Sequence, residues 1–584
     1  MMKSFSKLMF ATLLATGFWA CSDEVDVPDN GGTETKDKVY MSFDLQLPTA
    51  TRSETDDSGT TNSDANPDSE EGQTSENTVS SVVVVLATYT TGTYPTYTYL
   101  THSKTGYNLA GQGTSYTVTF EPNGPLESAA NQNVAVFVIC NPPSDFEANK
   151  LFDGGTDAKS TGSITSDNLT SNIASANNFL MANKSITKIQ LPSSDDMYKK
   201  HNTPGSAFFL GTVEVERTVA RFDFRAWGEL DANGNQLQDN KYTVETKSAT
   251  DNTATVQVVL TDMALLNLSK EYYYLRRVAA NSSANNAYDT DAITICGDEV
   301  NNNFVVDTDA ATKLSSWSNL SSWTADTYLL YNMGSASSVN LGTLWTTVSK
   351  GQTTSITEIV KGFEDKWDNA TETTDQKTYR FWRYATENTM PSVNSQIQAF
   401  STAVLFKGKI VTTESTDTRL SGTKAYVLKN VLYGTWEQVK SKVESITASE
   451  TNAGLLELKS AYETAAATME ENATEPSKAD AVDAGFTVYE RDSTEDDFEV
   501  YYYYKNRHND NNNPTTMGIM EYAVVRNNVY KLTVESISKF GHPADPAGDP
   551  DPIDPSDPDE EKVVYFTVSV RVLPWVVRVN NIEF

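Results

Sequence analysis

The clearest pattern in the chain is an alternation of apolar and polar residues near each end. Near the N-terminal end the apolar positions are Val39, Met41, Phe43, Leu45 and Leu47. Because neighbouring side chains of a β-strand point to opposite faces, this period of two predicts a half-buried strand over 39–47. Near the C-terminal end the alternate apolar positions are Val564, Phe566, Val568, Val570, Val572, Trp575, Val577 and Val579. We expect about two strand segments over 563–584, because Pro574 interrupts the alternation.

Between these ends the pattern predicts a mainly β protein. Runs of strand length and composition, separated by Gly and Pro clusters, occur at 82–87, 96–100, 116–120, 134–140, 213–224, 256–266, 272–278 and 524–536. Two helices are expected, at 435–444 behind a capping Thr435 and at 455–469. The interpretation is two β-sandwich domains, 53–228 and 229–542, with minor helical insertions in the second.

Two polar segments separate the end strands from the rest of the chain. Residues 53–77 are acidic and lack an apolar anchor, which indicates a disordered linker. Residues 543–562 are rich in Asp and Pro, which favours an extended linker whose charges repel one another. At about 3.1 Å per residue, such a linker reaches on the order of 60 Å. Each end strand is therefore expected to be tethered.

The first residues have the layout of an export signal. Lys3 and Lys7 precede a short apolar stretch that is too short to span a membrane, so 1–20 is interpreted as a signal peptide. Ala20 before Cys21 resembles the lipobox of bacterial lipoproteins, in which Cys21 would carry the lipid (palmitate), although Phe18 stands where Leu is usual. The alternative is an ordinary signal peptide that is cut nearby. The acidic residues after Cys21 resemble a surface-export signal.

A single basic residue follows the first strand. Arg52 is the only Lys or Arg between Lys38 and Lys104, so a trypsin-like protease would cut between Arg52 and Ser53. The cut would release a lipidated propeptide, 21–52, together with the first strand, and leave unpaired strand edges. The tethered strands of 563–584 from a neighbouring molecule can fill such a groove, and a head-to-tail contact of this kind gives a fibre. The alternative is a monomer in which both end strands pair within their own sheets.

Charge and side-chain chemistry exclude several functions. A formal net charge of −33 argues against nucleic-acid binding, which depends on neutralising phosphates. The four histidines, His102, His201, His508 and His542, stand in no catalytic motif, and Cys and His show no metal-ligand spacing. We therefore expect that the protein is not an enzyme and that it binds no cofactor and no metal. Cys140 and Cys296 each end an apolar run and are expected to be buried, and a disulfide between them stays open.

Several longer stretches resemble the fimbrillins of Bacteroidales, specifically the Mfa-type major fimbrial subunits of type V pili. They are VERTVARFDF at 215–224, YATENTM at 384–390, YYYYKNRHND at 501–510, VVRNNVYKLTVESISKFG at 524–541 and VRVLPWVVRV at 570–579. The resemblance implies two β-sandwich domains and a lipoprotein precursor anchored in the outer membrane. It also implies removal of the first strand by an Arg-specific protease, with Arg52 in the matching place, and polymerisation with identical or related subunits by donor-strand exchange. The linker after Arg52 is longer than this family leads one to expect.

The expected function is therefore a structural subunit of an adhesive surface fimbria, which binds host or bacterial targets. The alternative is a tip or accessory adhesin, or a glycan-binding surface lipoprotein that stays monomeric. The aromatic residues of 498–504 (FEVYYYY) would stack on sugars in that case, whereas in a structural subunit they alternate along a strand. A structural subunit would lose its residues up to Arg52, and a glycan binder would keep its lipid.

Overall fold

The computed structural model of the 584-residue chain describes most residues beyond the N-terminal segment. The described ranges are 38–47, 70–72, 74–104, 108–112, 115–152, 161–163, 173–224, 241–245, 255–282, 286–300, 302–316, 329–330, 346–347, 380–414, 416–513, 515–544, 556–559 and 566–576. The contacts divide the chain into residues 1–37 and a compact unit, Lys38–Phe584, which holds all of these ranges. The predicted signal peptide, Cys21, Arg52, Ser53, Val564, Val577 and Val579 lie outside the described residues.

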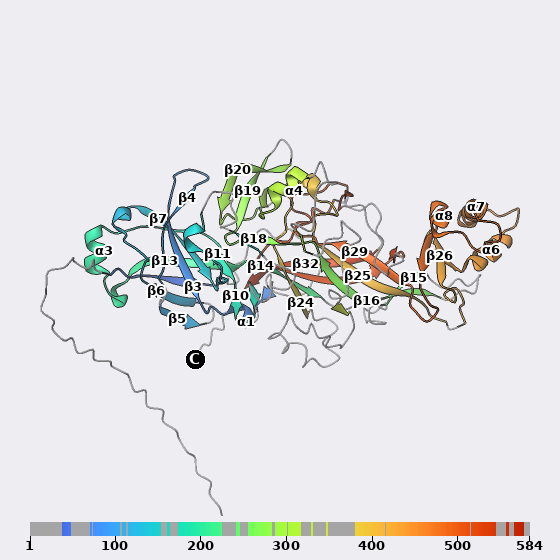
Figure 1. The fold of residues 1–584 in the computed structure, drawn as a ribbon, viewed down its shortest axis with the longest axis horizontal. Helices are drawn as coiled ribbons and strands as arrows, with labels where there is room; N and C mark the ends of the chain where they lie inside the picture. The colour runs from blue at the N-terminus through green and yellow to red at the C-terminus, as the bar shows by residue number, and fades with distance from the viewer. Residues whose placement is uncertain are drawn as a thin grey trace, which may run out of the picture. The chain divides into compact units, whose positions relative to one another are not determined.

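The chain is mainly β, with several sheets, which confirms the predicted fold class. The largest sheet has the strand order β4-β3-β7-β11-β13-β1-β6-β5, with β12 paired to β7 (Figure 1). Its strands are β1 (Met41–Gln46), β3 (Val82–Tyr89), β4 (Tyr97–His102), β5 (Asn108–Gln112), β6 (Ser115–Phe120), β7 (Asn133–Cys140), β11 (Met181–Asn183), β12 (Thr187–Gln190) and β13 (Phe208–Arg217). The strands expected at 39–47, 82–87, 96–100, 116–120 and 134–140 are all present.

A second sheet begins where the first one ends. After β13, only Thr218 precedes β14 (Val219–Phe224), so one stretch of backbone runs through both sheets. The second sheet has the order β2-β32-β30-β14-β24. Its other strands are β2 (Glu70–Glu71), β24 (Arg380–Thr386), β30 (Asn528–Ile537) and β32 (Phe566–Val576). The sequence predicted a single strand over 213–224 inside the first domain, whereas β14 pairs with β24 and β30.

A third sheet, of order β15-β16-β25-β29-β31 with β23 beside β16, carries the aromatic stretch 498–504. Its strands are β15 (Lys241–Glu245), β16 (Val256–Leu266), β23 (Thr346–Thr347), β25 (Ala403–Thr412), β29 (Glu499–Lys505) and β31 (His542–Pro543). Phe498, Tyr501, Tyr502 and Tyr503 are buried, and Tyr502 donates a hydrogen bond to the carbonyl of Lys539 at 3.0 Å. These four rings are therefore core residues and are not available for stacking on sugars, while Tyr504 is half-buried.

A helical insertion has its own small core. It consists of α6 (Trp436–Glu444), α7 (Ala453–Ala467) and α8 (Lys478–Asp483) with β26 (Lys424–Leu428), β27 (Val431–Gly434) and β28 (Thr487–Glu490). Thr435 caps α6 as predicted, and Trp436 packs against Tyr426 and Phe486 inside the insertion. Both predicted helices are confirmed. The three helices lie together beside β26 in Figure 1.

The remaining α-helices and β-strands have two to nine residues each. They are α1 (Thr74–Asn77), β8 (Thr161–Ser163), β9 (Ala174–Ser175), β10 (Asn178–Phe179), α3 (Ser194–Lys200), β17 (Leu268–Ser269), β18 (Glu271–Tyr273), β19 (Arg277–Ser282), β20 (Ala287–Ile295), β21 (Asn303–Val305), α4 (Ala310–Ser316) and β22 (Leu329–Leu330). The strand predicted at 272–278 is divided between β18 and β19. Pro574 does not interrupt the C-terminal strand: it lies inside β32 opposite Asn528, the first residue of β30, where little of the ladder remains to be broken.

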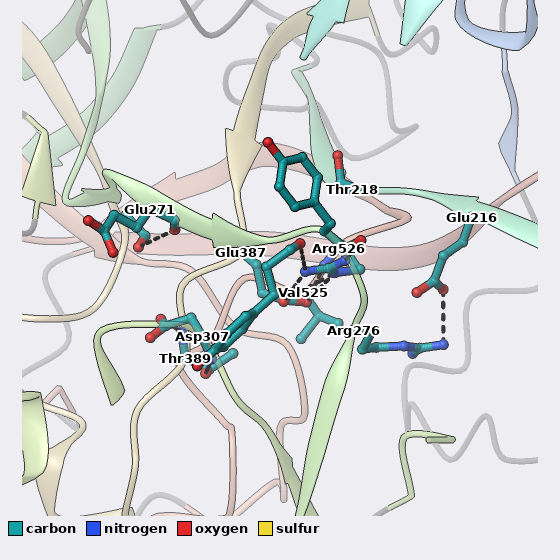
Figure 2. Close-up of polar contacts among 12 residues, drawn as sticks. Glu216, Thr218, Glu271, Arg276, Asp307, Glu387, Thr389, Val525 and Arg526 are labelled. Carbon is teal, nitrogen blue, oxygen red and sulfur yellow. Dashed lines mark hydrogen bonds and ion pairs between the residues drawn. The ribbon is translucent and has the colours of Figure 1, made fainter. Parts of the chain in front are cut away.

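A buried ion pair joins the end of β24 to the start of β30. The Arg526 guanidinium donates to both carboxylate oxygens of Glu387, at 2.9 and 3.1 Å, and both side chains are buried (Figure 2). Arg526 also donates to the carbonyls of Tyr273 and Tyr274, at 2.9 and 3.2 Å. Because both charged groups are buried, removal of either one would leave an uncompensated charge inside the protein.

We expect Arg526→Met to lower the free energy of unfolding by about 3–5 kcal/mol, since it leaves the Glu387 carboxylate buried without its counter-ion. The double variant Arg526→Met with Glu387→Gln should recover part of this loss. Urea unfolding of the full chain measures both. Lys199→Ala, which breaks an exposed pair with Asp195, is the control and should leave the unfolding midpoint unchanged. Equal midpoints for Arg526→Met and the wild type would contradict the prediction.

Candidate functional site: the first strand and the segments that hold it

The first strand lies in the middle of the largest sheet. β1 pairs in parallel with β13, where Met41 faces Phe208 and Leu45 faces Val213. On its other side it pairs antiparallel with β6, from Met41 opposite Phe120 to Gln46 opposite Ser115. In the sheet order, β5 and β6 reach the other strands through β1. Removing β1 would therefore expose the hydrogen-bonding edges of two strands at once.

A bulge in β13 adapts that strand to β1. The register shifts between Ser42 and Asp44, so that β13 carries one more residue than β1 over this stretch. Gly211 lies at the shift with a φ of +106°, a conformation that glycine adopts without strain. A Cβ atom at Gly211 would also lie 3.3 Å from Cγ2 of Thr187. The edge of β13 that pairs with β1 therefore depends on a backbone conformation that favours glycine at position 211.

The apolar face of the first strand packs into the hydrophobic core. Val39, Met41, Phe43, Leu45 and Leu47 are all buried, and Phe43 meets Phe120 edge to face with 6.3 Å between ring centroids. With roughly 2 kcal/mol for each buried side chain, these five contribute on the order of 10 kcal/mol of gross hydrophobic stabilisation. The alternate residue Asp44 faces outward and accepts a hydrogen bond from Thr117 at 2.9 Å.

The segment that follows the predicted cleavage position is anchored by a buried carboxylate. Glu76, in α1, is fully buried and accepts hydrogen bonds from Tyr384 in β24 at 2.6 Å and from Arg221 in β14 at 3.2 Å. Arg217 donates to the carbonyl of Glu76 at 3.2 Å and to the side chain of Asn77. The start of the chain beyond the linker is thus tied to strands of both large sheets.

These contacts correct the predicted linker. Residues 53–77 were expected to be disordered, but 70–72 and 74–77 have defined positions. Hydrophobic pattern could not reveal this, because Glu76 is held by charge and hydrogen bonds. The signal lay in VERTVARFDF, where Arg217 and Arg221 stand in an otherwise buried stretch and need acceptors. Burial lowers the pKa of Arg217 to about 10, in spite of the nearby Glu76.

The short strand β2 meets the C-terminal strand β32 in the second sheet. β2 pairs in parallel with β32, Glu70 opposite Trp575 and Glu71 opposite Val576. β32 in turn runs antiparallel along β30, from Ile537 opposite Phe566 to Asn528 opposite Pro574. Phe566, Val568, Val570, Val572 and Trp575, which were predicted to belong to a donor strand, are therefore paired within this chain. The segment after the linker 53–69 borders the C-terminal strand directly.

Other candidate residues have structural surroundings. Cys140 and Cys296 are both buried free thiols, so the disulfide that the sequence left open does not form, and burial raises the pKa of each. In the described part of the chain no three His, Cys, Asp or Glu side chains gather as metal ligands. Of the helices in these ranges, none combines the length and the apolar character needed to cross a bilayer.

We expect Phe43→Ala to destabilise the full chain by about 3–5 kcal/mol, because it opens a cavity beside Phe120. Asp44→Ala, on the outward face of the same strand, should change the free energy of unfolding by no more than about 0.5 kcal/mol. Urea titration followed by tryptophan fluorescence provides both values. Similar losses for the two variants would show that the strand is not held through its apolar face.

Comparisons with known proteins agree with the resemblance seen in the sequence. Residues 496–581 match the family described as major fimbrial subunit protein type IV, fimbrillin, C-terminal. That range contains β29, β30 and β32, and with them the YYYYKNRHND, VVRNNVYKLTV and LPW stretches. None of the curated proteins matches the chain.

Several solved structures with a likeness to the chain are described as fimbrial or cell adhesion proteins, and one is described as putative polysaccharide binding proteins. A fimbrilin (fimA) from Porphyromonas gingivalis W83 is 12% identical with a TM-score of 0.35, covering 92% of this chain and 98% of its own. A putative cell adhesion protein from Parabacteroides distasonis ATCC 8503 is 12% identical, with a TM-score of 0.34 and coverages of 92% and 99%. The tip fimbrial protein Mfa3 from Porphyromonas gingivalis is 9% identical, with a TM-score of 0.30 and coverages of 92% and 100%. We draw no conclusion from likenesses at these TM-scores. Over residues 496–581 the chain is similar to the fimbrillins, the major fimbrial subunit proteins, and the resemblance expected from its sequence is confirmed there.

Proposed function

We propose that this protein is a structural subunit of a bacterial surface fimbria that polymerises by exchange of β-strands. The observation that carries the proposal is β1, an internal strand of the largest sheet whose apolar side chains Met41, Phe43 and Leu45 are buried, as are Val39 and Leu47 on either side of it. It is joined to the rest of the chain through a segment that contains one basic residue, Arg52. A strand in this position is at once essential to the sheet and separable from the chain by one cut.

Release of the strand follows export in this proposal. The precursor is lipidated at Cys21 and anchored in the outer membrane, and an Arg-specific protease cuts between Arg52 and Ser53. The cut frees the lipid together with β1, so the anchor is temporary. Glu76 and its partners lie beyond the cut and continue to hold the new N-terminal segment against β14 and β24. The emptied groove is bordered by β13 and β6.

A neighbouring subunit supplies the replacement strand from 563–584. Five alternate apolar residues, Val564 to Val572, match the number of buried apolar residues over 39–47, of which three lie in β1. A donor in the same orientation as β1 runs parallel to β13 and antiparallel to β6. Because β32 is already paired along β30, the donor either leaves that ladder or extends into the groove with residues beyond Val576. Identical or related subunits joined in this way form a head-to-tail fibre at the cell surface, available for adhesion.

Arg52→Ala tests the release step. We expect the full-length variant to reach the cell surface, to keep its N-terminal lipid and to form no SDS-resistant ladder, because β1 stays in its groove. Lys104→Ala, at the next basic position along the chain, is the control and should polymerise like the wild type. SDS gels show whether ladders form, and N-terminal sequencing of the assembled material shows whether the first strand has been removed. Assembled subunits that begin at Cys21 would overturn the proposal.

A pair of double variants tests the donor segment. Val577→Asp with Val579→Asp places charges on the alternating apolar positions beyond β32, so ladders should disappear while the monomer keeps its melting temperature. Arg578→Asp with Asn580→Asp places the same side chains on the intervening positions and should still polymerise. The measurement is ladder formation after proteolytic removal of the first strand. Normal ladders from the first double variant would show that the residues beyond Val576 are not inserted into the groove.

A further inference from the structure

A lysine, an asparagine and an aspartate meet inside the chain, away from the first strand. Lys313 lies in α4, Asp307 precedes that helix and Asn388 follows β24, and all three side chains are buried. The Lys313 Nζ atom lies 2.9 Å from Asp307 Oδ2 and 2.6 Å from Asn388 Oδ1. Its other acceptor is the carbonyl of Thr389, at 3.4 Å. An amine is thus held against the carboxamide of a residue that lies 75 positions further along the chain.

The carboxamide is oriented toward the amine by its other bonds. Asn388 Nδ2 donates to the carbonyls of Asn267 and Phe400 and to Thr402 Oγ1, each at 2.9 Å. The carbonyl oxygen is therefore the atom that faces Lys313. The preceding residue, Glu387, is fixed by Arg526 (Figure 2). The backbone of Asn388 also exchanges hydrogen bonds with Val524, at 2.8 and 2.9 Å.

The aspartate is placed to accept the proton of the amine. Besides Lys313, Asp307 Oδ2 accepts from the backbone of Thr389 at 2.8 Å, and Oδ1 accepts from the backbone of Asp309 at 2.9 Å. Burial and the neighbouring Asp307 raise the pKa of Asp309 to about 7, because this interior disfavours two negative carboxylates. Val305, Val306, Ala310 and Val525 belong to the hydrophobic cluster of this region, which excludes water from the reacting atoms.

We propose that Lys313 and Asn388 join in the folded chain as an intramolecular isopeptide bond, with Asp307 as the proton carrier. Asp307 takes a proton from the Lys313 ammonium, and the neutral Nζ attacks Cγ of Asn388. A bond forms between Nζ and Cγ, and the bond between Cγ and Nδ2 breaks. Asp307 relays one further proton from Nζ to Nδ2, which leaves as ammonia. The products are a secondary amide, a protonated Asp307 and one ammonia molecule, so atoms and charge balance without an oxidant or a cofactor.

Two physical factors favour this reaction in the folded state. The fold holds nucleophile and electrophile in hydrogen-bond contact, which replaces a bimolecular encounter by an intramolecular step. The reaction also removes a charged ammonium and a charged carboxylate from a buried site, where unneutralised charges are costly. The product bond ties α4 to the end of β24 and closes the chain between 313 and 388 into a covalent loop, which restricts the unfolded state as a disulfide does.

Peptide mapping of the wild-type full chain tests whether Lys313 and Asn388 are joined. Trypsin does not cut after an acylated lysine, so we expect a branched peptide in which 278–350 is linked through Lys313 to 384–407. Its mass should be lower than the sum of the two peptides by one ammonia, and the intact protein should show the same deficit. Separate peptides 278–313 and 384–407 at full mass, from folded protein, would overturn the proposal and leave a buried ion pair. An ammonia deficit without the branched peptide would equally overturn it.

Variants assign the roles and separate chemistry from folding. Asp307→Asn keeps the shape of the side chain but removes the proton acceptor, so the chain should fold, by circular dichroism, and retain its full mass. Lys409→Met, at an exposed lysine that pairs with Asp497, is the control and should keep the branched peptide. A branched peptide in folded Asp307→Asn would overturn the role of Asp307. If that variant does not fold, Asn388→Ala, which should show full mass and separate peptides, tests the same bond from the electrophile's side.

Discussion

The architecture depends on the pairing of β1 on both of its edges. In the largest sheet this strand connects β13 to the β6–β5 pair, and its apolar face fills the space beneath them. Loss of β1 would leave the facing edges of β13 and β6 without a partner strand, because the other edge of β13 is paired with β11 and the other edge of β6 with β5.

A second constraint is the set of buried charges where the large sheets meet. Glu76 binds Arg221 and Tyr384, and Arg526 binds Glu387, and in both sets the groups come from segments far apart in the sequence. Lys313 binds the nearby Asp307 and also Asn388, which lies 75 positions further along the chain. Such contacts are costly to break singly, because the partner is left charged inside the protein. They belong to a part of the chain that does not include β1. Loss of the first strand would thus leave the joint between the sheets in place.

The sequence predicted elements well where the pattern is local, and poorly where a position is decided by distant partners. The structure contains the strand expected from the alternation over 39–47, the strand expected at 82–87 and the capped helix at 435–444. The spacing of apolar residues that predicts a strand or a helix is set by neighbouring residues, so it can be recognised in the sequence. The defined positions of 70–72 and 74–77 were missed, because Glu76 accepts its hydrogen bonds from Arg221 and Tyr384, which lie 145 and 308 positions away. The continuation of β32 through Pro574 was missed because a proline near the end of a ladder costs little. Arg52 and Cys21 stay predictions.

The continuity of β13 and β14 through Thr218 has a mechanical consequence. A fibre under flow is under tension, and in a strand-exchanged fibre that tension would enter at β13 and leave through the C-terminal residues after β32. The load would then pass along the backbone from β13 to β14 and across the ladders to β30 and β32. Because the start of β14 and the C-terminal end of β32 lie at the same end of this sheet, the ladders would be loaded from that end and their hydrogen bonds would break one after another. The helical insertion around α6 to α8 belongs to a different set of strands, so it would be carried along without bearing the force.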